Sequence, residues 1–126
     1  MLGVGASNIM IGRYGLPESE IERVRQRDTE CVYCHKNMER PGPDTKRQDW
    51  ATIEHLNHLP PWNNPKTIAI CCFSCNSSRG RRTILEWFKS KYCMERGINP
   101  DSVAQPVRDY IREYEGYMDK NNNPQN

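Results

Sequence analysis

Apolar residues recur at helical spacing near both ends of the chain. Residues 16–28 place apolar side chains along one side, with a proline in the first turn and acids ahead of arginines. That order complements the helix dipole and predicts a short helix. A longer apolar stripe follows Pro106 and consists of Val107, Tyr110, Ile111, Tyr114, Tyr117 and Met118. It predicts a final helix whose stripe packs against the body of the protein or against a second subunit.

The middle of the chain has the pattern of two strands and a helix. Residues 50–56, WATIEHL, alternate between two sets of side chains, and residues 67–72, TIAICC, are rich in β-branched residues. Both stretches are predicted strands. The linking residues 57–66, NHLPPWNNPK, hold three prolines and predict a loop rather than a tight hairpin. Thr83, with Glu86 three residues later, is a capping-box signature and predicts a further helix that ends at Gly97.

The chain of 126 residues suits a single α+β domain, residues 1–126. We expect its core at about residues 21–96, a C-terminal helical extension at 97–119 and a disordered tail at 120–126. Residues 39–49, rich in proline, glycine and charge, predict an exposed loop. Hydrophobic residues make up only 36% of the chain, so the core is small and a bound metal or disulfides would help to stabilise it.

The net charge of +2 points to no particular partner, but the charge distribution does. Residues 55–85 contain no acid and four basic residues, namely Lys66, Arg79, Arg81 and Arg82. This segment predicts a surface that faces an anion. A solvated basic face is the alternative.

The N-terminal segment MLGVGASNIMIG is apolar but lacks a basic region and is too short to span a bilayer. We therefore expect no export signal, no membrane association and a cytoplasmic protein. In a reducing compartment its six cysteines are expected to be metal ligands or free thiols rather than disulfides.

Four of the cysteines form two Cys-x-x-Cys pairs. Cys31 and Cys34 belong to CVYC, and Cys72 and Cys75 belong to CFSC. Each pair can direct two thiolates to one point, and four thiolates complete the tetrahedral shell of a structural Zn²⁺ site. A redox pair is the alternative, but it would explain only one of the two motifs.

Other readings of the cysteines fit less well. CVYCH also matches a c-type haem attachment motif with His35 as the axial ligand, but this leaves CFSC unexplained and requires export. Cys71 is an alternative ligand to Cys72 that breaks the two-residue spacing. Cys93 is expected to be a buried or free thiol.

An acid and a histidine end the first predicted strand, and an asparagine follows the last cysteine of the second pair. Glu54 and Asn76 offer the hard oxygen ligands that Mg²⁺ or Mn²⁺ prefers. His55 has a side chain that can accept a proton from water near neutral pH. Zinc bound by the four cysteines would bring these parts of the chain together.

Over about residues 21–82 the chain resembles the HNH nuclease family. The resemblance is carried by RVRQRDTECVYC, by ATIEH and by IAICCFSCNSSRG. It implies a zinc-stapled ββα-metal core with flanking N-terminal and C-terminal helices, and metal-dependent cleavage of phosphodiester bonds in DNA. It also implies that His55 is the general base and that Glu54 and Asn76 hold the catalytic Mg²⁺ or Mn²⁺. Such small nucleases act in bacteria or in phage-infected host cells.

Several further residues have less defined roles. Thr67 stands where the family often has asparagine, so Thr67, Asn63 or Asn64 could orient His55. His58 could approach the catalytic ion or a phosphate, or it could form an ordinary loop hydrogen bond.

We expect the predicted basic segment to contact DNA. Arg79 is expected to hold a phosphate, and Arg81 and Arg82 are expected to add salt-sensitive contacts to the DNA backbone. The protein is expected to be a monomer or a homodimer. The alternative function is a non-catalytic zinc module that binds nucleic acid or protein.

Overall fold

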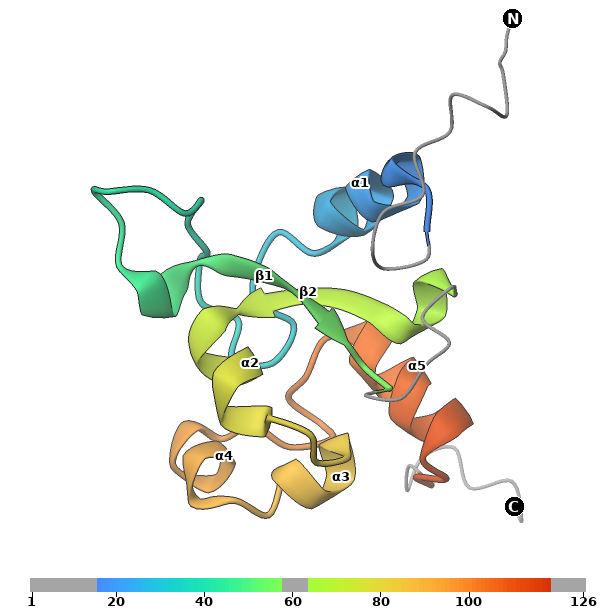
Figure 1. Ribbon diagram of the computed structural model, residues 1–126. Coiled ribbons are helices and arrows are strands. Elements are labelled where there is room, and N and C mark those ends of the chain that lie inside the picture. The colour runs from blue at the N-terminus through green and yellow to red at the C-terminus, as the bar shows by residue number, and fades with distance from the viewer. Residues whose placement is uncertain (1–15, 58–63, 119–126) are drawn as a thin grey trace, which may run out of the picture.

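The computed structural model describes residues 16–57 and 64–118, which form an α+β fold (Figure 1). A two-stranded antiparallel sheet lies among helices in these residues. The elements in chain order are α1 (Glu18–Arg27), η2 (Arg47–Asp49), β1 (Ala51–His55), η3 (Pro65–Thr67), β2 (Ile68–Cys72), α2 (Phe73–Arg79), α3 (Ile84–Trp87), α4 (Lys91–Arg96) and α5 (Gln105–Tyr114). None of the helices in the described residues has the length and apolar character needed to cross a bilayer.

The centre of the fold is a strand–strand–helix unit. β1 and β2 pair from Ala51 opposite Cys72 to His55 opposite Ile68, and α2 begins directly after β2. The Cys72 side chain caps α2 by accepting a hydrogen bond from the backbone N–H of Cys75. Both strands therefore lie where the sequence pattern predicts them.

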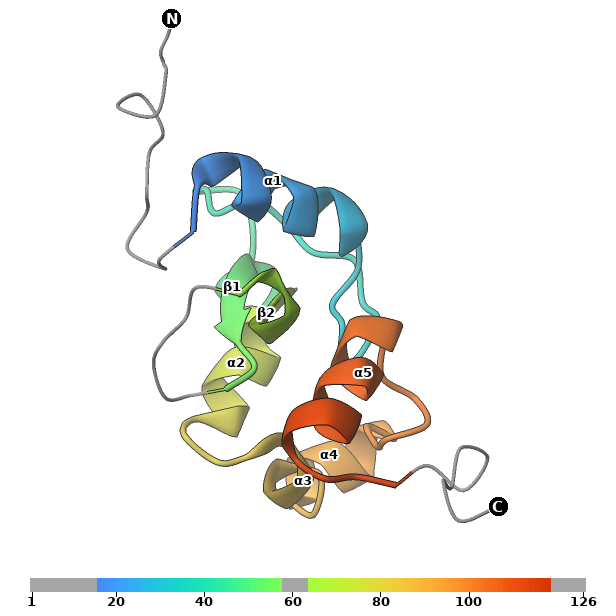
Figure 2. The same ribbon diagram turned by 90° about the vertical axis from the view of Figure 1, so that its right-hand side faces the viewer.

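Helices cover both faces of the sheet. In Figures 1 and 2, α1 lies across one face and α2 packs against the other. On the α1 face, Ile21 and Val24 pack against Ile68 and Ile70 in a small apolar cluster. The loop that precedes η2 projects from the body, in agreement with the predicted exposed loop at residues 39–49.

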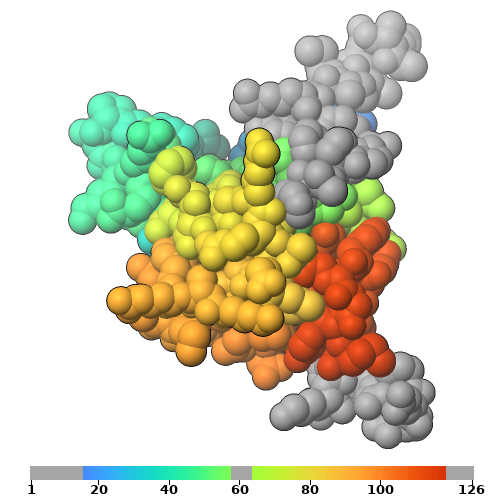
Figure 3. Space-filling model, turned by 60° about the horizontal axis from the view of Figure 1, so that its bottom comes forward, coloured from blue at the N-terminus to red at the C-terminus, as the bar shows by residue number. Residues whose placement is uncertain are grey.

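The larger core lies on the α2 side of the sheet. Trp87 at its centre is fully buried and packs edge to face with Tyr33, with ring centroids 4.8 Å apart. α5 contributes buried Val107 and Ile111 to the same cluster. The first part of the predicted stripe thus packs against the body, whereas Tyr114 and Met118 are exposed. Figure 3 shows α2, α3 and α4 as one continuous surface with α5 at its edge.

Two predicted helices are shorter than the sequence suggested. Thr83 does cap a helix, but that helix ends at Trp87, because Ser90 caps a new one by accepting a hydrogen bond from the N–H of Cys93. Gly97 ends α4 in the left-handed conformation, as predicted. Within the described residues, the predicted helical extension 97–119 contains one α-helix, Gln105–Tyr114, and Tyr117 and Met118 lie beyond it.

Candidate functional site

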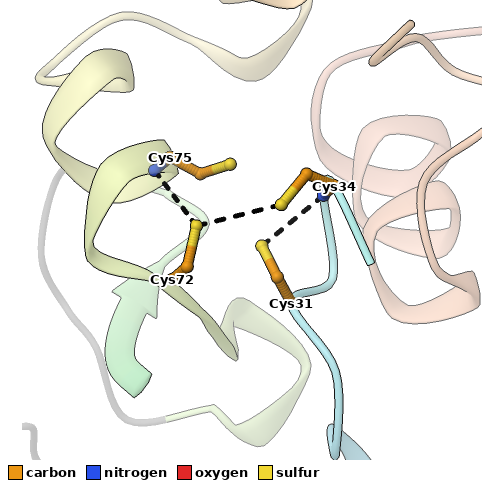
Figure 4. A group of neighbouring side chains, drawn as sticks. All are labelled: Cys31, Cys34, Cys72 and Cys75. Atoms are coloured by element: carbon orange, nitrogen blue, oxygen red, sulfur yellow. Dashed lines mark hydrogen bonds between the residues drawn. The ribbon is translucent and has the colours of Figure 1, made fainter. Parts of the chain in front are cut away.

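Two segments of the chain bring four cysteine sulfurs together (Figure 4). Cys31 and Cys34 come from the segment after α1, and Cys72 and Cys75 come from the junction of β2 and α2. Each pair has the same local geometry, in which the backbone N–H of the second cysteine points to the sulfur of the first, at 3.5 Å and 3.4 Å. His35, after the first pair, turns the chain with a φ of 66°.

The spacing of these sulfurs fits a tetrahedral metal ion. All four ligand atoms lie within 4.8 Å of one another, and Cys34 Sγ is 3.9 Å from Cys72 Sγ. Zinc–sulfur bonds of 2.3 Å in a tetrahedron separate the sulfurs by about 3.8 Å. All six cysteines are free thiols, with no disulfide among them. The cluster could therefore hold a metal ion, and its chemistry is consistent with structural zinc.

The other two cysteines lie outside this cluster. Cys71 is fully buried, and burial raises the pKa of its thiol well above the ordinary value. Its Sγ is 3.7 Å from the hydroxyl of Thr52. Cys93 is also buried, and burial raises its pKa. The spacing argument against Cys71 and the expectation of a buried thiol at Cys93 both agree with the structure.

Glu54 lies on the α2 face of β1 and is almost fully buried, with 4% of its surface exposed. Its Oε2 accepts hydrogen bonds from Tyr33 Oη at 2.6 Å and from Arg79 Nη1 at 2.9 Å. Within residues 16–57 and 64–118, no hydrogen bond reaches its Oε1. Burial raises the pKa of Glu54, and the Arg79 guanidinium opposes that rise. One oxygen of this carboxylate is thus held by two donors, and the other has no hydrogen bond from a described residue.

Asn76 lies on α2 and has a similar arrangement. Its Nδ2 donates to Thr52 Oγ1 at 3.0 Å and to the carbonyl oxygen of Ile53 at 3.3 Å. These two bonds use the amide hydrogens and fix which end of the amide is the oxygen. Among the described residues, Oδ1 has no hydrogen-bond donor. The nitrogen of the side chain is thus anchored to β1, while its oxygen has no bond to the described residues.

His55 is the last residue of β1 and is partly exposed. Its carbonyl oxygen accepts a hydrogen bond from Arg79 at 3.0 Å. Burial lowers the pKa of the His55 imidazole, and the charge of Arg79 lowers it further. The ring is therefore neutral at pH 7, which is the form that can accept a proton.

Arg79 differs from the prediction. Only 1% of its surface is exposed, and its guanidinium donates inward to Glu54 and to the carbonyls of His55, Leu56 and Arg82. A phosphate on a surface-bound DNA cannot reach these nitrogens. The expected phosphate contact of Arg79 is therefore wrong in this structure, because the buried carboxylate of Glu54 takes the cation as its counter-ion.

The remaining basic residues and loop candidates have separate positions. Arg81 and Arg82 are exposed on the turn after α2, and Arg82 also donates to the carbonyls of Ser78 and Arg79. Asn64 Oδ1 accepts from the N–H of Lys66, and its Nδ2 donates to Tyr114 Oη. Thr67 Oγ1 donates to the carbonyl of Asn64. These bonds serve the η3 turn and α5 rather than the His55 ring. His58 and Asn63 lie outside the described residues.

Two groups of side chains thus adjoin the strand–strand–helix unit. Four thiols gather at the junction of β2 and α2, two of them from the segment after α1, and Glu54, His55 and Asn76 lie along β1 and α2. Comparisons with protein families, with curated proteins and with solved structures gave no match. Sequence reasoning missed Tyr33 and the inward orientation of Arg79. The sequence does contain a signal for the orientation of Arg79. Arg79 lies one helical turn after Asn76, so both side chains are on the side of α2 that faces β1.

Proposed function

We propose that this protein is a zinc-stapled, metal-dependent DNA endonuclease of the HNH type. Zinc at Cys31, Cys34, Cys72 and Cys75 would have a structural role, since four thiolates leave no open position. Glu54 and Asn76 would hold a catalytic Mg²⁺ or Mn²⁺. His55 would act as the general base.

One observation carries this proposal. Glu54 and Asn76 each have one polar atom anchored by other protein groups and one oxygen without a hydrogen bond from any described residue. Partners behind a ligand that fix its orientation are typical of metal sites. A hard divalent ion would satisfy both oxygens at once.

Different side chains of the protein would perform different parts of the reaction. His55, neutral at pH 7, accepts the proton of the attacking water as the new bond to phosphorus forms. The 3′ oxygen departs with the electron pair of the broken P–O bond. A divalent ion, when bound, supplies charge that stabilises the crowded phosphate and this leaving oxygen. Arg81 and Arg82, both exposed, add phosphate contacts that do not depend on base sequence.

A second candidate is a non-catalytic zinc module that binds nucleic acid or protein. One contact favours it, because the Arg79 guanidinium already neutralises Glu54 at 2.9 Å without a metal ion. A carboxylate compensated in this way can be a purely structural group.

Plasmid cleavage separates the two candidates. Zinc-loaded wild type is incubated with supercoiled DNA in Mg²⁺, Mn²⁺ or EDTA, beside His55→Ala and the control His35→Asn. Asparagine tolerates the φ of 66° at position 35, so the control removes a histidine outside the site without backbone strain. We expect metal-dependent nicking or linearisation, a loss of about 100-fold or more in His55→Ala and no loss in the control. Supercoiled DNA left intact by wild type in every metal would refute the nuclease and favour the binding module.

A further inference from the structure

Tyr33 connects the two groups of side chains. It lies between Cys31 and Cys34 in the first cysteine pair, and its side chain is fully buried. Its hydroxyl donates to Glu54 Oε2 at 2.6 Å, across 21 residues of sequence. One residue of the first cysteine pair's segment therefore contacts the carboxylate that is proposed to hold the catalytic ion.

The position of this hydroxyl is set by the loop and by the core. Trp87 packs edge to face against the Tyr33 ring, with centroids 4.8 Å apart. Two hydrogen bonds hold the backbone of the neighbouring Val32. Its N–H donates to the carbonyl oxygen of Ile70 at 3.2 Å, and its own carbonyl oxygen accepts from the N–H of Ala104 at 2.9 Å. The phenol has little freedom, so its hydroxyl lies at a fixed point beside β1.

The chemistry of the contact suits an orienting role. A phenol hydroxyl carries its proton at neutral pH, so Tyr33 can donate to a carboxylate oxygen. The short 2.6 Å distance fits an O–H donor on an ionised carboxylate. Tyr33 and Arg79 both bond to Oε2, and two donors on one oxygen fix the rotation of the carboxylate.

We propose that Tyr33 is a positioning residue that couples the four-cysteine centre to Glu54. Ordering of the first cysteine pair places the Tyr33 hydroxyl, and the hydroxyl turns the second carboxylate oxygen toward the catalytic ion. This inference rests on the proposed function, since it assigns that ion to Glu54. Loss of an orienting partner of this kind costs about 10- to 100-fold in metal affinity.

The test compares Tyr33→Phe with Tyr92→Phe. The Tyr92 hydroxyl also lies at the cysteine cluster, where it donates to Cys75 Sγ at 3.3 Å, and it makes no hydrogen bond to Glu54. For each zinc-loaded protein we would measure zinc content, thermal unfolding, Mn²⁺ binding by electron paramagnetic resonance and plasmid cleavage. We expect Tyr33→Phe to retain its zinc and to bind Mn²⁺ about tenfold or more weakly than wild type. Tyr92→Phe should bind Mn²⁺ like wild type.

The outcomes separate this inference from the proposed function. Equal Mn²⁺ affinity in wild type and Tyr33→Phe, with cleavage by both, overturns the role of Tyr33 and leaves the nuclease standing. No Mn²⁺ binding and no cleavage by wild type overturns both.

A measurement on wild type covers the case in which Tyr33→Phe does not fold. With ¹³C-labelled tyrosine, addition of Mg²⁺ should shift the Cζ resonance of Tyr33 and leave that of Tyr92 unchanged. Bound Mg²⁺ without a shift at Tyr33 overturns the inference.

Discussion

Replacement of Arg79 by methionine tests the central ion pair of the structure. The substitution keeps an apolar stem of similar length and removes the guanidinium. It leaves the carboxylate of Glu54, 4% exposed, without its cation, and it leaves the carbonyls of His55 and Leu56 without their donors. The expected result is a large loss of stability.

The magnitude follows from the burial of both partners. Their side chains are only 1% and 6% exposed, so solvent cannot replace the lost interactions. Removing one partner of a buried pair costs about 3–5 kcal/mol. That is a large part of the 5–15 kcal/mol that roughly spans the stability of folded domains. For a chain of 126 residues, a loss of about 4 kcal/mol lowers the melting temperature by about 15 °C.

The assay is urea unfolding followed by tryptophan fluorescence, with zinc in excess. Arg81→Met is the matched control, since Arg81 is exposed and should change the free energy of unfolding by about 0.5 kcal/mol or less. Adding Glu54→Gln to Arg79→Met should restore part of the loss, because the uncompensated charge is then gone. A loss under about 1 kcal/mol in Arg79→Met would refute the burial of this ion pair.

Two further predictions concern the metal cluster and the start of α3. Cys75→Ala should lose its zinc and unfold, as measured by metal analysis and circular dichroism. The control Cys93→Ala should keep its zinc. A wild-type protein that is folded without zinc would contradict this prediction. Glu115 caps α3 from a distance, with its carboxylate oxygens 3.0 Å and 2.9 Å from the N–H groups of Ile84 and Leu85. Glu115→Ala should cost about 1–2 kcal/mol and speed hydrogen exchange at those two amides, while the exposed Glu113→Ala should do neither.

Local patterns in the sequence were enough to predict most of the strand–strand–helix unit. The alternation of residues 50–56, the β-branched run at 67–72 and the spacing of the cysteine pairs each reflect one short stretch of chain. The break between α3 and α4 was harder to predict. Ser90 interrupts an apolar pattern that continues on both sides, and only its cap to Cys93 marks the new helix.

The position of Arg79 one helical turn after Asn76 is a local signal for its inward orientation, but the groups that bind it lie far from it in the sequence. The side chain is directed by a carboxylate 25 residues away and by the carbonyls at the end of β1. A charged residue in a basic segment is usually exposed to solvent, so the charge distribution predicted that Arg79 lies on the surface. The same reasoning overlooked Tyr33, because a tyrosine between two cysteines gives no sign of a partner 21 residues further on.

The distance along the chain between the two cysteine pairs has a consequence for the cell. Cys34 and Cys72 are 38 residues apart, and closing a loop of that length costs roughly 3 kcal/mol of chain entropy. With zinc as the occupant, binding supplies the free energy that closes this loop, so folding and metal uptake are one equilibrium. Each tenfold change in free zinc then shifts stability by about 1.4 kcal/mol once the site is near saturation. The amount of folded protein would thus follow the zinc supply of the cell.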